Sequence, residues 1–462
     1  MSAARHAASF RDPNGFVYTR DGILHRQVQP SYAAHYEHLL TSGLYRSLVS
    51  DDLLVAHEEV STELALAPGA HRVLRPRPLP FISHPYEWCF GALRDAALLT
   101  LEVQRRALDH GMTLKDASAY NVQLDGGRPV FIDTLSFERW TVGEPWVPYR
   151  QFCQHFLAPL ALMARVDIRL GTLLREHLGG IPLDLASRLL PRRTWWRPGT
   201  LLHVHLHARS IRKWEDADES GAAMRRARPL SRHGMLALID SLRSTIEGLR
   251  WTPAGTEWAE YATSHSYSTD ALEAKRRFVA RAIARTAPST VWDLGANTGT
   301  FSRIAAATGA SVISFDVDPA VVERNYRQLR AEGLTRILPL VVDLTNPGGG
   351  TGWAARERAA FADRGPADAL LALALVHHLA ITHDVPFAAI AEWFASLGRT
   401  LVIEFVPKSD AMVRRLLASR EDLFADYHQQ GFEQSFAPRW QTISREPIPG
   451  SERVLYLMHR RD

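Results

Sequence analysis

The second half of the chain alternates short apolar runs with segments whose apolar residues recur at helical spacing. The runs of strand length are 291–294, 311–315, 337–342, 367–373 and 400–405. The segment 301–307 supplies a helix between the first two runs. Strands that alternate with helices in this way predict an α/β domain built on a mostly parallel sheet.

The first two apolar runs end at residues with the chemistry of a nucleoside site. Asp293, Gly295 and Gly299 accompany the first run, and Asp316 ends the second. A side chain at either glycine would hold the backbone away from a ligand lying across the strand ends. A carboxylate at the end of the second strand is placed to accept hydrogen bonds from both hydroxyls of a ribose. The pattern therefore predicts nucleoside binding.

The glycine spacing indicates which nucleoside is bound. A dinucleotide fold needs G-x-G-x-x-G to approach a pyrophosphate, whereas this chain has D-x-G-x-x-x-G. That pattern resembles the first motif of class I S-adenosylmethionine (SAM) dependent methyltransferases; the alternative is a Rossmann-like fold with another ligand. The resemblance implies SAM as the cofactor and a third-strand Asp343 that meets the adenine amino group. The implied cofactor residues are Asp293, Gly295, Ala296, Asn297, Thr298, Gly299, Asp316, Val317, Asp343, Leu344 and Tyr267.

Later segments continue the resemblance in order along the chain. The run 400–405 reads as the fifth strand, and 441–445 with 454–458 resemble the closing antiparallel hairpin of this fold. The expected fold class is therefore α/β, with a Rossmann-like, seven-stranded methyltransferase sheet in the C-terminal domain. The whole layout resembles a bacterial two-part subgroup related to a nodulation-type methyltransferase, and this likeness covers most of the chain after about residue 20.

Helical segments precede the first strand of this domain. Residues 235–249 and 270–285 have helical periodicity, and 251–267 between them is aromatic and polar. In class I methyltransferases such a segment covers the SAM site, which makes Tyr261, His265 and Tyr267 candidate lid residues. The alternative is that these aromatic side chains pack a helix against the sheet.

The loop after the fourth strand carries the candidate catalytic residues. A hydroxyl or a protonated nitrogen must lose its proton when it accepts a methyl group, and histidine has a suitable ordinary pKa near neutrality. His377 and His378 follow the fourth strand, and Glu404 lies at the end of the fifth. We expect one of the histidines to act on the acceptor, with Glu404 as second choice. The alternative is that a histidine here only bonds the neighbouring strand end.

The N-terminal half contains a different motif. Asp116, four intervening residues, Asn121, a hairpin and an apolar strand ending in Asp133 follow the order of a protein-kinase catalytic loop and its metal-binding aspartate. The apolar segments 149–163, 170–178 and 183–190 resemble the helical lobe that comes after such a loop. The resemblance predicts an α+β, kinase-like N-terminal domain with a helical lobe.

Other parts of a kinase are missing from the sequence. There is no glycine-rich phosphate loop upstream, and the four lysines are Lys115, Lys213, Lys275 and Lys408, so none precedes residue 115. Arginine at 72, 75 or 77 is a poor geometric replacement for that lysine. Three readings remain open: a degenerate kinase-like scaffold, an active phosphotransferase, and an α+β domain in which Asp116 and Asn121 cap a turn.

The composition of the chain indicates its domain boundaries, its location and its cysteine chemistry. The charge-balanced stretch around 215–228 indicates a linker, so we expect domains at 1–207 and 234–462 joined by 208–233. Arg or Asp interrupts every apolar run before membrane-span length, and a cytoplasmic location is the default expectation. The two cysteines, Cys89 and Cys153, are too few for a disulfide framework.

Features that are absent from the sequence reduce the number of possible classes of methyl acceptor. No cysteine nucleophile lies near the fourth strand, no Asn/Asp-Pro-Pro-aromatic loop is present, and the net charge of +4 forms no basic stripe. Nucleic acid and membrane are therefore not expected partners, and a small-molecule acceptor or a presented protein side chain remains. His203, His205 and His207 alternate but have no neighbouring acidic or cysteine ligand, so no metal is expected. The function hypotheses are a methyltransferase, a methyltransferase fused to an active phosphotransferase, and a non-catalytic SAM-binding scaffold.

Overall fold

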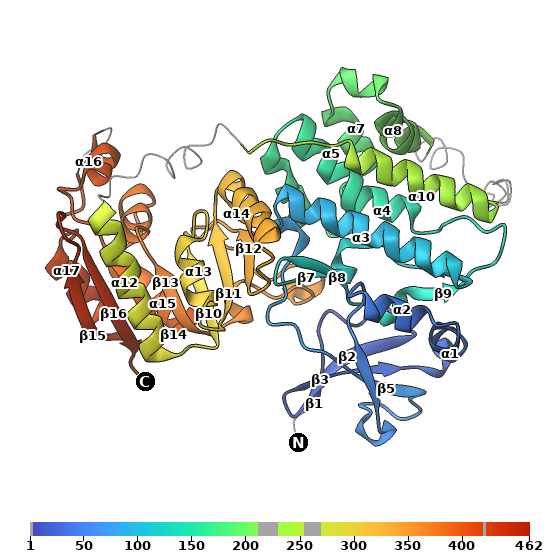
Figure 1. The fold of residues 1–462 in the computed structure, drawn as a ribbon, viewed down its shortest axis with the longest axis horizontal. Helices are drawn as coiled ribbons and strands as arrows, with labels where there is room; N and C mark the ends of the chain where they lie inside the picture. The colour runs from blue at the N-terminus through green and yellow to red at the C-terminus, as the bar shows by residue number, and fades with distance from the viewer. Residues whose placement is uncertain (1–2, 211–229, 254–268, 419–421) are drawn as a thin grey trace. The chain divides into compact units, whose positions relative to one another are not determined.

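The computed structural model describes residues 3–210, 230–253, 269–418 and 422–462 (Figure 1). The described chain forms two compact units. The first contains Met1–Thr252 together with Gly350–Arg358, and the second contains Pro253–Gly349 and Ala359–Asp462. Among the described residues, no helix is both long enough and apolar enough to span a membrane.

The first unit begins with an antiparallel sheet. Its described strands follow the order β1-β2-β3-β5-β4, and two helices lie between β3 and β4 in the sequence. Tyr32, Tyr36, Val28 and Leu74 pack together with Leu135 in a buried cluster. The bounds are β1 Ala3–Arg5, β2 Gly15–Arg20, β3 Ile23–Val28, α1 Ala33–Thr41, α2 Leu44–Ser50, β4 His57–Val60 and β5 Arg72–Pro76.

A long buried helix and a helical lobe complete the first unit. Helix α3 (Phe90–Asp109) buries Leu93, Leu101 and Leu108. Two small antiparallel pairs follow: β6 (Met112–Leu114) with β9 (Phe137–Arg139), and β7 (Val122–Asp125) with β8 (Arg128–Phe131). The lobe consists of α4 Tyr149–Phe152, a π-helix Cys153–Leu157, α5 Ala158–Arg165, α6 Leu173–Glu176, α7 Leu183–Leu189, α8 Pro198–Thr200 and a π-helix Leu201–Leu206.

His203 and His205 lie in the second π-helix and not on a strand face, and His207 directly follows it. His203 bonds the Tyr149 hydroxyl at 2.7 Å and Ser241 Oγ at 2.8 Å. His205 bonds Ser187 Oγ and Thr194 Oγ1. Both rings are thus satisfied by side chains of the same unit, which accounts for their burial.

Helix α10 (Arg232–Glu247) belongs to the first unit, although the sequence placed the domain boundary before it. Its apolar stripe is buried. Ion pairs join it to α3, between Arg105 and Asp240 and between Arg243 and Glu102. The boundary between the units follows Thr252. The apolar residues that recur at helical spacing over 235–249 form the face of α10 that packs against α3, so this helix stays with the first unit. The expected linker at 208–233 lies mostly outside the described residues.

A short segment from the second half of the sequence is also part of the first unit. Residues 350–358 form a closed loop in which Thr351 and Arg358 exchange backbone hydrogen bonds. Arg11 Nε donates to Glu357 Oε1 at 2.9 Å, and Arg11 Nη2 donates to Glu357 Oε2 at 2.8 Å. The Arg358 guanidinium lies 3.9 Å from the centroid of the Tyr120 ring. Nothing in the sequence pattern predicted this loop.

The second unit contains the predicted seven-stranded sheet among its described residues. The order is β12-β11-β10-β13-β14-β16-β15. Strands β12 to β14 run parallel, whereas β16 pairs antiparallel with β14 and with β15, so the closing hairpin is confirmed. The bounds are β10 Thr290–Leu294, β11 Ser311–Asp316, β12 Ile337–Val341, β13 Ala367–Ala372, β14 Gly398–Phe405, β15 Trp440–Pro447 and β16 Val454–Arg460.

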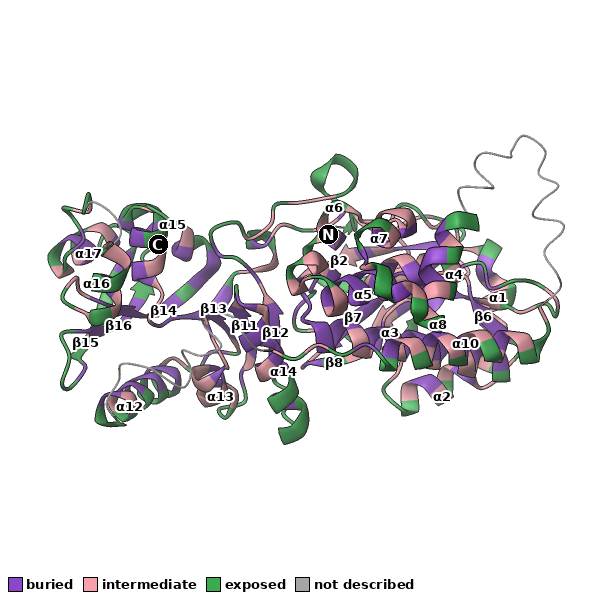
Figure 2. Cartoon of the chain, turned by 90° about the horizontal axis from the view of Figure 1, so that it is seen from above, coloured by how far each residue is buried: buried purple, intermediate pink, exposed green. Residues whose placement is uncertain are grey.

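Helices flank this sheet and bury its core. Val291, Val312, Leu371 and Val402 come from adjacent strands of one apolar cluster, in which Phe278 of α12 also packs; Figure 2 shows the strands in the buried colour. The helices are α12 Thr269–Thr286, α13 Thr300–Ala306, α14 Pro319–Glu332, a π-helix His378–Thr382, α15 Phe387–Leu397, α16 Ala411–Leu417 and α17 Gln429–Phe436.

Candidate active site

The site is a cavity at the carboxyl ends of the parallel strands of the second unit. Its volume is about 490 Å³, within the usual range for a small-molecule site. The chain order reverses between β10 and β13, because β11 and β12 lie on one side of β10 whereas β13 and β14 lie on the other. Ligands of open α/β sheets bind outside the strand ends at such a switch point.

The turn after β10 brings backbone to the cavity. Gly295, Ala296, Asn297 and Thr298 line it, and the amides of residues 295 and 296 both donate to the Phe315 carbonyl at 2.9 Å. Gly295 has φ +74°, and a Cβ there would lie 3.3 Å from Leu375, which also lines the cavity. The close approach of this glycine to a ligand stays a prediction.

The role expected for Gly299 needs correction. Gly299 does not line the cavity; it precedes α13 with φ +77°. A Cβ at this position would lie 2.7 Å from Asn325 Nδ2 and 2.8 Å from Asn325 Oδ1. The left-handed backbone and the Asn325 side chain account for glycine here, and a contact with a ligand stays a prediction.

Two carboxylates at the strand ends have raised pKa values. Asp293 Oδ2 accepts from Ser302 Oγ at 2.6 Å, and Asp316 accepts from the amides of Asn297 and Asp318 at 2.8 and 2.9 Å. Burial raises the pKa of Asp293 and of Asp316 to about 6, against the opposing effect of these hydrogen bonds. Both residues line the cavity, so a ligand that donates hydrogen bonds would meet acceptors held in place by the backbone.

The remaining predicted cofactor residues lie around the same cavity where they are described. Val317, Asp343 and Leu344 line it. Asp343 is exposed, and its Oδ1 accepts from the Thr345 amide at 2.8 Å and from Thr345 Oγ1 at 2.6 Å. The candidate lid residues Tyr261, His265 and Tyr267 lie outside the described residues.

The two candidate histidines differ in position. His378, at the start of the π-helix His378–Thr382, lines the cavity together with Thr382 and His383. His377 is 2% exposed and does not line it, and among the described residues its Nδ1 has no hydrogen-bond partner. Of the two, His378 is the residue that can contact an acceptor in the cavity.

The expected near-neutral pKa of the histidines is wrong. Burial, reinforced by the charges of His383 and Arg453, lowers the pKa of His378 to about 4. Burial holds the pKa of His377 well below its usual value. Both rings are therefore neutral at pH 7, which suits an imidazole that accepts a hydrogen bond or a proton.

Glu404 does not line the cavity, contrary to its expected role as a second base. It is fully buried; its Oε2 lies 2.6 Å from Lys275 Nζ and its Oε1 lies 3.1 Å from Arg453 Nη1. Arg453 Nε is also 2.8 Å from Asp410 Oδ2. Glu404 is thus the counter-ion of two buried cations. Lys275, which lines the cavity, was missed; its rarity as one of four lysines was the available signal.

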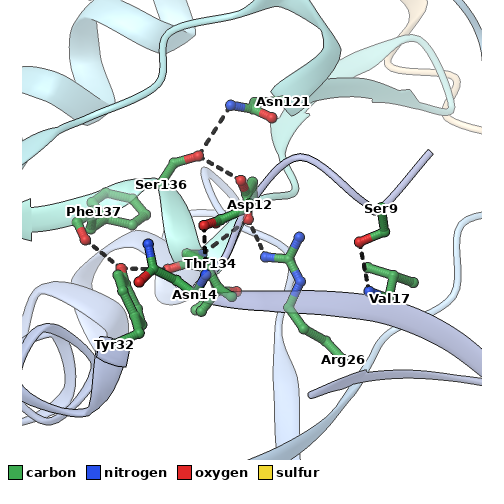
Figure 3. Close-up of polar contacts among 12 residues, drawn as sticks. Ser9, Asp12, Asn14, Val17, Arg26, Tyr32, Asn121, Thr134, Ser136 and Phe137 are labelled. Atoms are coloured by element: carbon green, nitrogen blue, oxygen red, sulfur yellow. Dashed lines mark hydrogen bonds and ion pairs between the residues drawn. The ribbon is translucent and has the colours of Figure 1, made fainter. Parts of the chain in front are cut away.

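The kinase-like motif of the first unit forms a closed polar cluster. Arg26 of β3 is ion-paired with Asp133, and Ser136 Oγ donates to Asp133 Oδ2 at 2.7 Å. Asn121 Nδ2 in turn donates to Ser136 Oγ at 3.1 Å, as Figure 3 shows. Asp116 Oδ1 accepts from the Ser118 amide at 2.9 Å, so it holds a turn. These contacts agree with the turn-capping reading, and the kinase-like assignment stays a prediction.

The sheet order, the glycine turn and the strand-end carboxylates around one cavity are features that the sequence resemblance to class I SAM-dependent methyltransferases predicted. No family model matches the chain. The nodulation protein NoeA of Rhizobium meliloti (strain 1021) is 38% identical over 461 residues, which cover 99% of this chain and 96% of that protein. The chain therefore belongs to the family of NoeA.

Two solved structures illustrate a likeness that covers less than half of the chain. The N-methyltransferase NodS from Bradyrhizobium japonicum WM9, in complex with S-adenosyl-L-homocysteine (SAH), is 13% identical. It covers 44% of this chain and 98% of its own, with a TM-score of 0.32. The bifunctional kinase-methyltransferase WbdD is 14% identical and covers 43% of this chain and 41% of its own, with a TM-score of 0.32.

Proposed function

We propose that the protein is a SAM-dependent methyltransferase that acts on an oxygen or nitrogen of a small molecule. The observation that carries the proposal is a single cavity of about 490 Å³ that joins the glycine turn, Asp316, Asp343 and His378. These residues fit the group. Asp316 offers carboxylate oxygens to ribose hydroxyls, and the exposed Asp343 is able to accept a hydrogen bond from the adenine amino group.

The chain's own residues position the acceptor and receive its proton. SAM supplies an activated methyl group, so alignment of the acceptor with that carbon provides most of the rate enhancement. The neutral His378 ring accepts a hydrogen bond from the acceptor hydroxyl or amine. Although a pKa of about 4 makes His378 a weak base, the proton of a hydroxyl acceptor becomes strongly acidic as its oxygen bonds to the methyl carbon. His378 therefore only needs to receive that proton late.

The first unit acts as a scaffold in this proposal and not as a second active site. A kinase needs the aspartate in the position of Asp133 to hold magnesium. In this chain the Arg26 guanidinium already neutralises that carboxylate, and this charge holds the pKa of Asp133 below its usual value against the effect of burial. Titration with ATP and magnesium is accordingly expected to give no binding heat.

The proposal is tested by measuring methyl transfer and cofactor binding separately. Protein incubated with methyl-tritiated SAM and a metabolite extract is expected to label small molecules. His378→Gln removes a proton acceptor, so the rate should fall about 10²- to 10⁴-fold while SAH affinity stays within about threefold. The control is His459→Gln, an exposed residue near the end of β16 that does not line the cavity, which should leave both quantities unchanged.

The same experiment separates the alternatives. If the wild-type protein binds SAH but labels nothing in any extract, the non-catalytic scaffold is favoured over the enzyme. If SAH does not bind at all, the assignment of the cavity is wrong. An unchanged rate for His378→Gln would refute the role of His378 while leaving the methyltransferase proposal intact.

A further inference from the structure

Lys275 is a buried cation whose presence in the cavity the proposed mechanism does not explain. It lies on α12, its side chain is 3% exposed, and it contributes to the cavity lining. Arg276, which also lines the cavity, is about half exposed and lies near Glu273 of the same helix. Of these two cations, Lys275 is the one whose charge is held away from bulk water. A charge in such surroundings interacts more strongly with an anion than a charge in water does.

The contacts of Lys275 locate it at one end of the cavity. Its Nζ is 4.8 Å from the centroid of the Phe301 ring, in the first turn of α13, and 2.6 Å from Glu404 Oε2 on β14. Asp316 is the last residue of β11, and Asp343 lies two residues after β12; both strands are on the opposite side of β10 from β14. The cavity therefore has Asp316 and Asp343 toward the β12 side, Asp293 at the end of the central strand β10, and a lysine toward the β14 side.

This division of charge matches the two ends of the proposed cofactor. The adenosine end presents hydroxyls and an amino group, which are hydrogen-bond donors, and the amino-acid end presents a carboxylate. We propose that Lys275 binds the carboxylate of the methionyl part of SAM and so distinguishes ligands with the amino acid from those with adenosine alone. The inference rests on the proposed function.

The surrounding negative charges oppose the effect of burial on Lys275. Burial lowers its pKa, while the charges of Glu404 and Asp293 oppose that effect. Glu404 also contacts Arg453, which contacts Asp410, so two cations and two anions alternate in the chain Lys275–Glu404–Arg453–Asp410. A buried network with paired charges tolerates an ammonium group that burial alone would neutralise.

The test compares two ligands that differ by the amino acid. SAH carries it, and 5′-methylthioadenosine has the same nucleoside thioether without it. For Lys275→Met, calorimetry is expected to show SAH binding at least tenfold weaker and methylthioadenosine binding within twofold of wild type. Lys408→Met is the matched control, because Lys408 pairs with Asp422 and does not line the cavity; both affinities should be unchanged.

Several outcomes overturn the assignment. An equal loss for both ligands means that Lys275 is structural, and an unchanged SAH affinity means that it does not meet the carboxylate. If neither ligand binds the wild-type protein, the proposed function itself has failed, which is a distinguishable result.

Lys275→Met leaves Glu404 without one of its partners and so could prevent folding. Two further variants keep the test decisive in that case. Lys275→Met combined with Glu404→Gln removes both charges and leaves Arg453 with Asp410. This double variant is expected to show the same selective loss of SAH, whereas Lys275→Arg should retain most of the preference for SAH. A double variant that binds SAH as tightly as wild type would refute the inference.

Discussion

Replacing the Asp316 carboxylate should separate ligand affinity from protein stability. In Asp316→Asn the side chain keeps its shape but loses its charge, and each charge-assisted hydrogen bond contributes about 1.5–3 kcal/mol. We expect SAH binding to weaken by about 1–3 kcal/mol, since the amide retains one acceptor oxygen; this is roughly a 5- to 150-fold rise in Kd. Calorimetric titration at pH 7.5 measures it.

The same substitution should leave the ligand-free protein nearly as stable as before. The folded pKa of Asp316, about 6, is above its ordinary value of 3.8, so ionisation destabilises the fold increasingly as pH rises from 3.8 to 6, and fully above 6. Removing that charge stabilises the fold by up to about 3 kcal/mol at pH 7.5. This gain is offset by the loss of a hydrogen bond. The two oxygens of Asp316 accept from the backbone amides of Asn297 and Asp318, whereas asparagine has one oxygen and leaves one of these amides without its acceptor.

The matched control for this prediction is two residues away. Asp318 does not line the cavity, and its Oδ1 accepts from the Ala320 amide at 2.8 Å to cap α14. Asparagine caps helices as well as aspartate does, so Asp318→Asn should preserve both affinity and melting temperature. An SAH affinity unchanged in Asp316→Asn would refute the reasoning, as would a loss of equal size in Asp318→Asn.

Two further predictions concern pH and backbone strain. Because Asp316 has a pKa of about 6 and the ribose contact needs its carboxylate form, SAH affinity should be nearly level above pH 7 and fall about tenfold by pH 5; a constant affinity measured by calorimetry across this range would contradict the assignment. Gly299→Ala should reduce the free energy of unfolding by about 2–3 kcal/mol in urea titration, through its positive φ and the contact with Asn325. Gly309→Ala, with φ +97° and no atom within 4 Å, should lose only the backbone part of that cost, and an equal loss in both variants would show that Asn325 adjusts without cost.

The sequence predicted the second unit well because its signals are local. Each parallel strand is a continuous apolar run, and each strand end carries a residue of distinct chemistry, such as Asp293 or Asp316. Helix α14 illustrates the same point: Asp318 caps its start, Pro319 occupies its first turn, and Gly333 with φ +67° follows its end. Local patterns of this kind specify an element without knowledge of its neighbours.

The sequence failed where a residue's role depends on distant partners. Glu404 has the position of a strand-end base, but Lys275 and Arg453 come from other parts of the chain and neutralise it. Burial lowers the pKa of His378, and no property of the residue pair 377–378 reveals that burial. Arg26 meets Asp133 across more than a hundred residues, so the motif around Asp133 looked more like a magnesium site than its contacts support.

The central claim, that the strand ends of the second unit bind SAM, is tested most directly by a crystal structure of the full chain grown with SAH. The account predicts density in the cavity, with the ribose hydroxyls within hydrogen-bond distance of the Asp316 carboxylate and the amino-acid carboxylate beside Lys275. A cavity without ligand in crystals that contain saturating SAH, or SAH bound away from Asp316, would contradict it.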